Sequence, residues 1–174
     1  AARRQSDGAA DLVADLFELA VLDRPAPALR LGPVPLGELA RDVADRHRLA
    51  FDRDGVALVL DLPPGLPVIE ADGARLVRLL SNLLDNARRH TPAGGSVRLG
   101  AHAGDGVAVL EVADTGEGIA ADRLEQVFDR YYRGTDARTR GTGTGLGLAI
   151  VQAIAHAHGG RVEAESGVGE GATF

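Results

Sequence analysis

Residues 72–90 have the sequence DGARLVRLLSNLLDNARRH, which carries apolar residues at helical spacing. Asp72 is a residue type that caps helix N-termini, and the turn sequence TPAGG follows at residues 91–95. The apolar positions are 4, 3, 1 and 3 residues apart, which fits one face of an α-helix: Leu76, Leu80, Leu83, Leu84 and Ala87. We therefore predict an amphipathic helix over this stretch, with one face packed against the rest of a domain.

The sequence on either side of this helix alternates between helical and strand patterns. Before it, residues 36–50 predict a helix, residues 56–62 a strand and residues 68–69 a short extended piece. After it, residues 96–103 and 107–113 predict a β-hairpin with its turn near 104–106, and a short helix follows at 122–127. A helix over 146–158 and strands over 161–164 and 171–174 complete the pattern. The prediction is an α+β fold, an α/β sandwich with one mixed, mostly antiparallel sheet of about five strands and three main helices on one face.

The N-terminal part differs from the rest of the chain. Four prolines fall between Pro25 and Pro35, and we predict a linker there. Before the linker, residues 12–20 have helical spacing, but a helix of this length is not stable alone and needs a partner. The chain contains no Met, so we expect it to be part of a longer protein.

The composition excludes several classes of function. The 19 basic residues, all Arg, and 25 acidic residues give a net charge of −6, which disfavours sequence-independent binding of nucleic acid. Without Lys, the chain cannot be a P-loop NTPase, a protein kinase of the usual fold or a Schiff-base enzyme. Without Cys, it has no disulfide, thiolate zinc site or Cys nucleophile.

Polar residues form a second stripe on the helix at 72–90. Asn82, Asn86 and Arg89 are 4 and 3 residues apart and share a face. A carboxamide oxygen suits Mg²⁺, which takes few protein ligands, and an Arg suits phosphate. The alternative from spacing alone is a solvated helix face.

Two glycine-containing loops can approach a ligand closely. The sequence DTGEGIAA at residues 114–121 follows a predicted strand, and it also fits a relaxed dinucleotide-binding fingerprint or a plain turn. The dinucleotide reading lacks a second strand ending in an acid about 20 residues later, because Asp136 lies in a loop. Glycines alternate from Gly141 to Gly147 and then a helix begins, which predicts an anion site at its N-terminus, or else a flexible linker. None of the histidines has nucleophile or metal-ligand spacing, and His158 is expected to end a helix.

Taken in order, these segments resemble the ATP-binding catalytic domain of sensor histidine kinases, in the GHKL ATPase superfamily. NLLDNA at 82–87 resembles the N box, DTGEGI at 114–119 the G1 box, VFDRYYR at 127–133 the F box and GTGLGLAI at 143–150 the G2 box. The sequence HGG at 158–160 and the tail at 166–174 also fit. The resemblance runs from about Leu36 to Phe174, and four motifs in the same order make it specific.

The resemblance implies a role for each matching residue on the long helix. Asn86 would coordinate Mg²⁺ on the phosphates of ATP, with Asn82 in support. Arg89 stands where the family often has Lys, and His90 where Tyr or Phe is frequent. Both would lie near the nucleotide.

The remaining motifs imply the adenine and phosphate contacts. Asp114 would accept a hydrogen bond from the adenine amino group, with Gly116, Gly118 and Ile119 against the base. Residues 128–145 would form a long ATP lid that brings Tyr132 and Arg133 near the nucleotide. The segment that wraps the triphosphate would comprise Gly143, Thr144, Gly145, Leu146, Gly147 and Leu148.

The resemblance also implies an organisation and partners. Residues 1–24 would end a two-helix dimerisation domain, 25–35 would be a linker and 36–174 the catalytic domain. None of the five histidines has the context of a phosphoacceptor, so the acceptor His would lie on a dimerisation domain outside this chain. The expected partners are that domain, in a homodimer, and a response regulator, with no nucleic acid. The expected location is the cytoplasmic part of an inner-membrane sensor.

Two alternatives within the superfamily remain open. One is a protein-serine kinase of the anti-sigma type, and the other is a non-catalytic ATP-binding regulator. Rapid ATP hydrolysis is not expected, because Asn82 stands where gyrase- and Hsp90-like ATPases usually have a Glu base.

Overall fold

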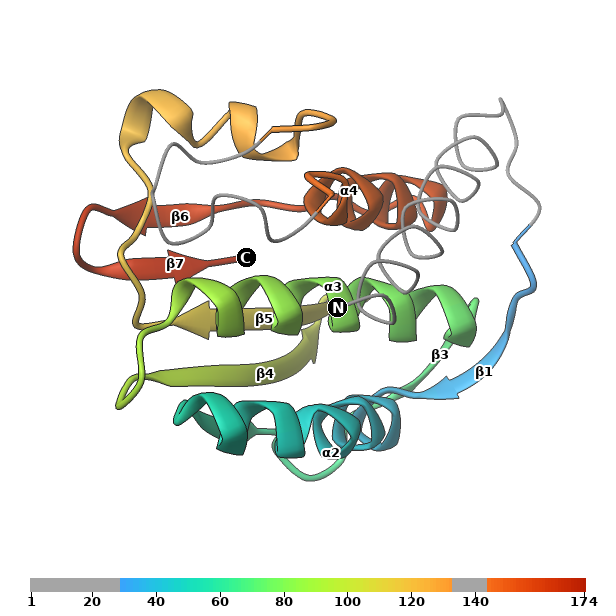
Figure 1. Ribbon diagram of the computed structural model, residues 1–174. Helices are drawn as coiled ribbons and strands as arrows, with labels where there is room; N and C mark the ends of the chain where they lie inside the picture. Colours follow the sequence, from blue (N-terminus) through green and yellow to red (C-terminus); the bar gives the residue numbers. More distant parts are fainter. Residues whose placement is uncertain (1–28, 133–143) are drawn as a thin grey trace, which may run out of the picture.

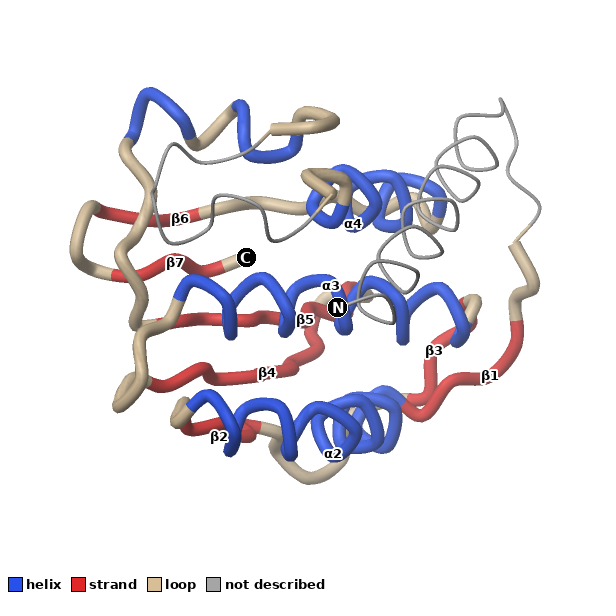
Figure 2. The backbone as a smooth tube through the Cα atoms, in the orientation of Figure 1, coloured by secondary structure: helices blue, strands red, loops and turns tan. Residues whose placement is uncertain are grey.

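The structure is a computed structural model that describes residues 29–132 and 144–174. Its main sheet has the strand order β2-β4-β5-β7-β6, with β2 and β4 parallel and the other neighbours antiparallel. The helices lie on one face of this sheet (Figure 1, Figure 2) and enclose the core with it. The main elements are α2 (Leu36–Asp54), β2 (Ala57–Asp61), α3 (Gly73–His90), β4 (Ser96–Gly104), β5 (Val107–Asp114), α4 (Gly147–Ala157), β6 (Glu165–Gly167) and β7 (Gly171–Thr173). This confirms the predicted α+β class, the mixed five-stranded sheet and the three helices.

Helix α3 forms as its sequence predicts. The Asp72 side chain caps its N-terminus by accepting a hydrogen bond from the Arg75 N–H at 3.2 Å. Its apolar stripe enters the core, where Leu80 and Leu84 are completely buried. Burial of one such side chain stabilises the fold by roughly 1.5–3 kcal/mol. The polar residues Asn82, Asn86 and Arg89 lie beside this stripe, so packing of α3 in the core also fixes their positions.

The β4–β5 hairpin also matches its prediction. Gly104 pairs with Val107, so the turn consists of Asp105 and Gly106. Both turn residues have positive φ, 51° and 77°, as the tight hairpin turn with Asp-Gly at its centre requires. The hairpin carries the chain to Asp114, the first residue of the DTGEGI segment.

The predicted linker is partly a strand. Strand β1 (Gly32–Pro35) pairs antiparallel with β3 (Val68–Ala71) in a separate two-stranded sheet. Pro33 and Pro35 are compatible with this position because β1 is an edge strand. Residues 1–28, including the predicted end of a dimerisation domain, lie outside the described residues.

Three other boundaries differ from the prediction. Helix α2 continues to Asp54, because Gly55 supplies the left-handed residue that ends it. The helix expected at 122–127 is instead two 3-10 turns, Ala121–Arg123 and Gln126–Phe128. The strand expected at 161–164 is wrong, since only Glu165–Gly167 pairs with β7.

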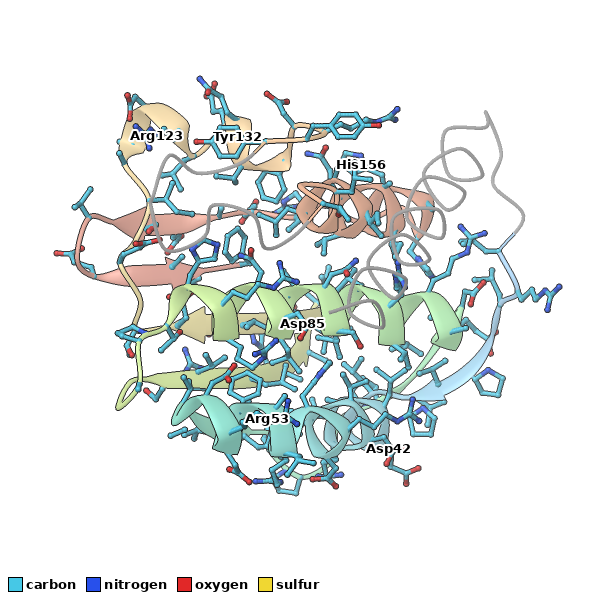
Figure 3. All side chains as sticks on the ribbon, in the orientation of Figure 1. Asp42, Arg53, Asp85, Arg123, Tyr132 and His156 are labelled. Atoms are coloured by element: carbon cyan, nitrogen blue, oxygen red, sulfur yellow. The ribbon has the colours of Figure 1, made fainter. Side chains whose placement is uncertain are left out.

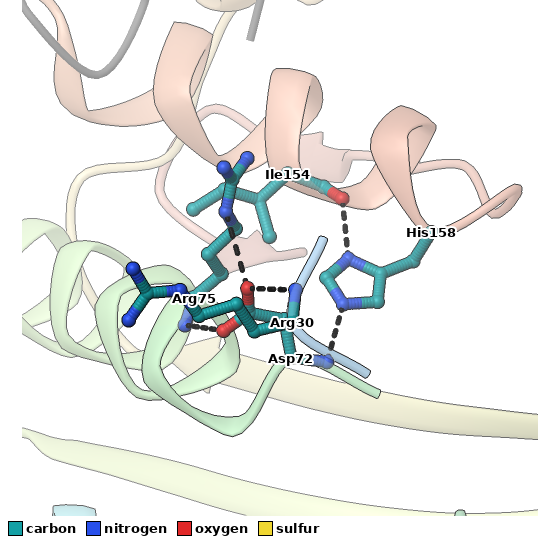
Figure 4. Close-up of polar contacts among 5 residues, drawn as sticks. All are labelled: Arg30, Asp72, Arg75, Ile154 and His158. Carbon is teal, nitrogen blue, oxygen red and sulfur yellow. Dashed lines mark hydrogen bonds and ion pairs between the residues drawn. The ribbon is translucent and has the colours of Figure 1, made fainter. Parts of the chain in front are cut away.

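A polar junction ties the start of α3 to the end of α4 (Figure 4). His158 hydrogen-bonds the Ile154 carbonyl through Nδ1 at 2.9 Å, and its Nε2 accepts from the Asp72 N–H at 3.0 Å. The Asp72 carboxylate also accepts from the Arg30 N–H at 3.0 Å. His158 is therefore a helix-end residue, as predicted, and it fixes the two helices at the ends remote from the glycine-containing loops.

Within residues 29–132 and 144–174, no helix combines the length and hydropathy that a bilayer crossing needs.

Candidate functional site

The predicted site residues come together where β5, the C-terminal half of α3 and the N-terminus of α4 meet. The DTGEGI segment, which we call the G1 loop (residues 114–119), leaves the end of β5. It contacts α3 on one side and the β6–β7 hairpin on the other. The start of α4 lies beside Asn82 of α3.

Asp114 is buried, with 8% of its surface exposed, at the root of the G1 loop. Burial raises the pKa of its carboxyl group, and hydrogen bonds from the N–H groups of Gly116 and Ala172 partly oppose that effect. The Gly116 bond to Oδ1 is 2.8 Å long. A carboxylate has about four acceptor positions, so Asp114 keeps capacity to accept from an amino group of a ligand.

Backbone contacts hold the first half of the G1 loop. Thr115 joins β4 by accepting from the Ser96 N–H through Oγ1 at 2.9 Å and by donating its own N–H to the Ser96 carbonyl at 3.0 Å. Gly116 lies so close to the His90 carbonyl of α3 that a Cβ there would collide with it. The side chains of His90 and Glu117 meet, with 3.0 Å between Nδ1 and Oε1.

The β6–β7 hairpin holds the second half of the loop. Gly118 has φ +71° and its Cα faces the Gly167 carbonyl, which leaves no space for a side chain. The Gly169 N–H donates to the Glu117 carbonyl at 2.8 Å. The Ile119 N–H donates to Ser166 Oγ at 2.8 Å.

The N-terminus of α4 lies beside the side chain of Asn82, whose Nδ2 atom has no hydrogen-bond partner among the described residues. The Asn82 Nδ2 atom is buried and makes no hydrogen bond with the part of the chain that the structure describes. A Cβ placed on Gly147 would lie 3.9 Å from the Asn82 side chain, so the amide is adjacent to the first residue of α4. Orphaned buried donors are rare in proteins, and a helix N-terminus attracts anions. An anionic ligand at this position would satisfy both features.

The other α3 residues fit a magnesium site that is completed by a ligand. Asn86 lies one turn after Asn82 and is half-buried, and Arg89 is exposed on the same face. Among the described residues, no group of three or more His, Cys, Asp or Glu side chains could hold a metal. Mg²⁺ commonly combines one or two protein oxygens with phosphate oxygens and water, so a single carboxamide is compatible with it.

The glycine-rich loop contributes backbone more than side chains. Leu146 is completely buried and Leu148 packs against the core, so neither side chain can contact a phosphate. Thr144 Oγ1 accepts from the Leu146 N–H at 3.2 Å. Arg133 and Gly143 lie outside the described residues.

Tyr131 and Gly145, on either side of the glycine-rich segment, contact each other. The Tyr131 N–H donates to the Gly145 carbonyl at 2.8 Å, and Tyr131 has a positive φ of 65°. Tyr132 packs against the core from the segment after the second 3-10 turn (Figure 3). Phe128 contacts Phe174 edge to face, with 6.2 Å between ring centroids.

Sequence reasoning assigned no role to Ser166 or Thr115, although both belong to motifs that fit the family. Their hydroxyl groups bond backbone atoms far away in the sequence, by 47 and 19 positions respectively. A local pattern carries no signal for such contacts. Only the resemblance of the tail at 166–174 pointed to the region.

Known proteins share this sequence and fold. Residues 71–174, more than half of the chain, match the family described as histidine kinase-, DNA gyrase B- and HSP90-like ATPase. The signal transduction histidine-protein kinase BaeS of Escherichia coli is 38% identical over 129 residues, which cover 74% of this chain and 27% of that protein. The histidine protein kinase DivJ of Caulobacter vibrioides is 37% identical over 165 residues, or 94% of this chain and 27% of that protein.

A solved structure is similar to this chain in both fold and sequence. Full-length ShkA in complex with AMPPNP superposes with a TM-score of 0.87 at 36% identity, covering 99% of this chain and 36% of that one. This chain thus spans about a quarter of the two curated relatives, and about a third of the solved one. The family match, the relatives and the shared fold lead to one conclusion: the chain belongs to the histidine kinase-, DNA gyrase B- and HSP90-like ATPase family.

Proposed function

We propose that this chain is the ATP-binding catalytic half of a two-component sensor histidine kinase. The observation that carries the proposal is the buried Asn82 amide beside the N-terminus of α4, whose Nδ2 atom has no hydrogen-bond partner within residues 29–132 and 144–174. It lies on the same helix face as Asn86 and Arg89, so one anionic group can contact all three. The 37–38% identity to two histidine kinases supports the choice of this activity within the family.

Each part of the site has a separate task. Asp114 accepts from the adenine amino group, while Gly116, Gly118 and Ile119 form the backbone surface beside the base. Asn86 holds Mg²⁺, which neutralises charge on the phosphates when it is bound. Asn82, Arg89 and the first N–H groups of α4 bind phosphate oxygens.

The reaction is phosphoryl transfer to a His on a dimerisation domain outside residues 29–174. An imidazole nitrogen of that His forms a bond to the γ-phosphorus, the bond from phosphorus to the bridging oxygen breaks, and ADP leaves. Positioning and charge neutralisation supply most of the catalysis in such reactions. The proposed partners are this dimerisation domain and a response regulator, in a homodimeric protein that is anchored in the inner membrane with the catalytic domain in the cytoplasm.

A titration of the whole chain with ATP tests the proposal. Calorimetry should show ATP binding that Mg²⁺ strengthens, and Asn86→Ala should remove the Mg²⁺ effect without unfolding the protein. Ser81→Ala, one position before Asn82, is the matched control on the same helix. Failure of the folded wild-type chain to bind ATP would contradict the proposal.

A further inference from the structure

The G1 loop is held by the hydroxyl group of Ser166, a residue that has no role in the site as described above. Ser166 Oγ accepts a hydrogen bond from the Ile119 N–H at 2.8 Å, and it donates one to the Gly171 carbonyl at 2.5 Å. Ser166 is half-buried on β6. One side chain therefore joins the last residue of the G1 loop to the first residue of β7.

The β6–β7 hairpin also contacts Asp114, the first residue of the G1 loop and the proposed acceptor of the adenine amino group. Gly171 has φ +79° and packs against the Asp114 carbonyl, where a Cβ would collide. The next residue, Ala172, donates its N–H to the Asp114 carboxylate. The Ser166 hydroxyl thus fixes Gly171, and Gly171 precedes the residue that supports Asp114.

Thr115 and Gly116, between the two ends of the loop, have supports that do not involve Ser166. Thr115 is bound to Ser96, and Gly116 is packed on His90. Ile119 has Ser166 as the side-chain acceptor of its N–H. Loss of this hydroxyl would remove the side-chain acceptor of the Ile119 N–H and one donor to the Gly171 carbonyl in a half-buried place, which is more costly than loss of an exposed hydrogen bond.

We propose that Ser166 is a positioning residue for the adenine-binding end of the site, and that its hydroxyl holds Ile119 and Asp114 at the spacing that an adenine base requires. This inference rests on the proposed function. It predicts that Ser166 affects recognition of the base and leaves recognition of the phosphates unchanged. Ser166 touches no reacting atom, so its effect passes through the G1 loop.

The test compares two ligands across matched variants of the whole chain. Calorimetry would measure Mg-ATP and inorganic tripolyphosphate with Ser166→Ala, Ser166→Val and Ser166→Thr. Thr keeps the hydroxyl and Val has the same shape without it. We expect Ser166→Ala and Ser166→Val to lower the affinity for Mg-ATP by about ten-fold, as the loss of one or two hydrogen bonds implies. The affinity for tripolyphosphate should not change. We expect the Mg-ATP affinity of Ser166→Thr to stay within about two-fold of wild type, because Thr keeps the hydroxyl group.

Hydrogen exchange followed by NMR gives a direct readout. The Ile119 amide should exchange faster in Ser166→Val than in Ser166→Thr. Ser96→Ala is the control, because Ser96 bonds Thr115 through its backbone only. Equal Mg-ATP affinity in the Val and Thr variants, a parallel loss of both ligands, or unfolding of the Ala and Val variants would overturn the inference. Wild-type protein that fails to bind ATP would instead contradict the proposed function.

Discussion

Asn82 shows how a single residue can lower the stability of the free protein and serve a ligand. Its buried amide has no protein partner among the described residues. An unsatisfied buried polar group typically costs about 1–3 kcal/mol. We therefore expect a substitution at Asn82 to change the stability of the ligand-free protein and its affinity for phosphate in opposite directions.

The Asn82→Ala variant tests this opposition. We expect the free energy of unfolding of the ligand-free protein to rise by about 1 kcal/mol, because the orphaned amide is removed. Affinity for tripolyphosphate should fall, since the amide no longer contacts phosphate. Urea unfolding and calorimetry would measure the two effects, with Ser81→Ala correcting for helix propensity. A variant that loses stability, or that binds tripolyphosphate as well as wild type does, would contradict the role of Asn82.

His47 is a half-buried histidine through which we expect stability to depend on pH. Burial lowers the pKa of its imidazole, as does the nearby Arg88, while Asp85 acts in the opposite direction. Both ring nitrogens are buried without a hydrogen bond to a described residue. Between the lowered pKa and the ordinary value of 6.5, the unfolded chain binds more protons than the folded one.

We therefore expect the free energy of unfolding to fall as the pH drops below about 6.5. His47→Gln should remove this part of the pH dependence, because Gln does not titrate. His102→Gln, at an exposed position on β4, is the control. Urea unfolding at several pH values would measure the slope. An identical slope in wild type and His47→Gln would show that His47 is not responsible.

At the scale of elements, local sequence signals predicted α3, the β4–β5 hairpin and α4 correctly. They did not predict strands that form by pairing with a distant part of the chain. The capping Asp72 and the Asp105-Gly106 turn act within a few residues of the chain, so their sequence carries the information. Strand β1 exists because β3 pairs with it, across more than thirty residues. Residues 161–164 alternate between polar and apolar side chains, but within the described residues only 165–167 pair with β7.

The same division applies to the candidate site. The positions of Asn82, Asp114 and the G1 loop followed from motifs in the order that the family has. The supports of the loop did not, because Ser166 acts through a hydrogen bond to a backbone group 47 positions away. Leu146 is buried in the apolar core and Leu148 packs against it, so a contact of either residue with phosphate would be made by backbone groups, which the motif alone does not reveal.

The N-cap of α3 should contribute measurably to stability. The Asp72 carboxylate accepts from two backbone N–H groups, of Arg30 and Arg75, and pairs with the Arg75 guanidinium at 3.4 Å. We expect Asp72→Ala to lower the free energy of unfolding by about 1–2 kcal/mol in urea at pH 7. Asp45→Ala is the control, because Asp45 forms an exposed pair with Arg48 that contributes little. Equal effects of the two substitutions would contradict the cap.

At the scale of the whole molecule, α3 and α4 run between the Asp72–His158 junction at one end and the proposed nucleotide site at the other. The junction of Asp72 and His158 fixes the N-terminal end of α3 and the C-terminal end of α4 (Figure 4). The opposite ends, with Asn82 to His90 and with Gly147, face the proposed nucleotide. The contacts of His158 with both helices therefore help to set how α3 and α4 lie relative to each other at the proposed phosphate site.

The arrangement of histidines in the molecule leads to the last prediction. His158 uses both ring nitrogens in the junction, His47 has both buried, and His90 is bound to Glu117 through Nδ1. His102 and His156 are exposed, but neither belongs to the site as described above. A phosphoacceptor must present a free ring nitrogen in line with the γ-phosphate. His90 has only Nδ1 bonded, but it is held against the G1 loop, on the proposed adenine side of the site, so we expect none of the five to accept the phosphoryl group within its own molecule.

We therefore expect no acid-labile phosphate on this chain after incubation with labelled Mg-ATP. A dimerisation domain of the same protein, added separately, should become labelled on its His. Labelling should be slow, because transfer between separate molecules lacks the effective concentration of a tethered domain. Acid-stable and acid-labile phosphate would be measured on both proteins, with Asn86→Ala as the inactive control. Stoichiometric phosphohistidine on the isolated chain would show that one of its own histidines is the acceptor, and the division into a nucleotide-binding half and a separate acceptor half would be wrong.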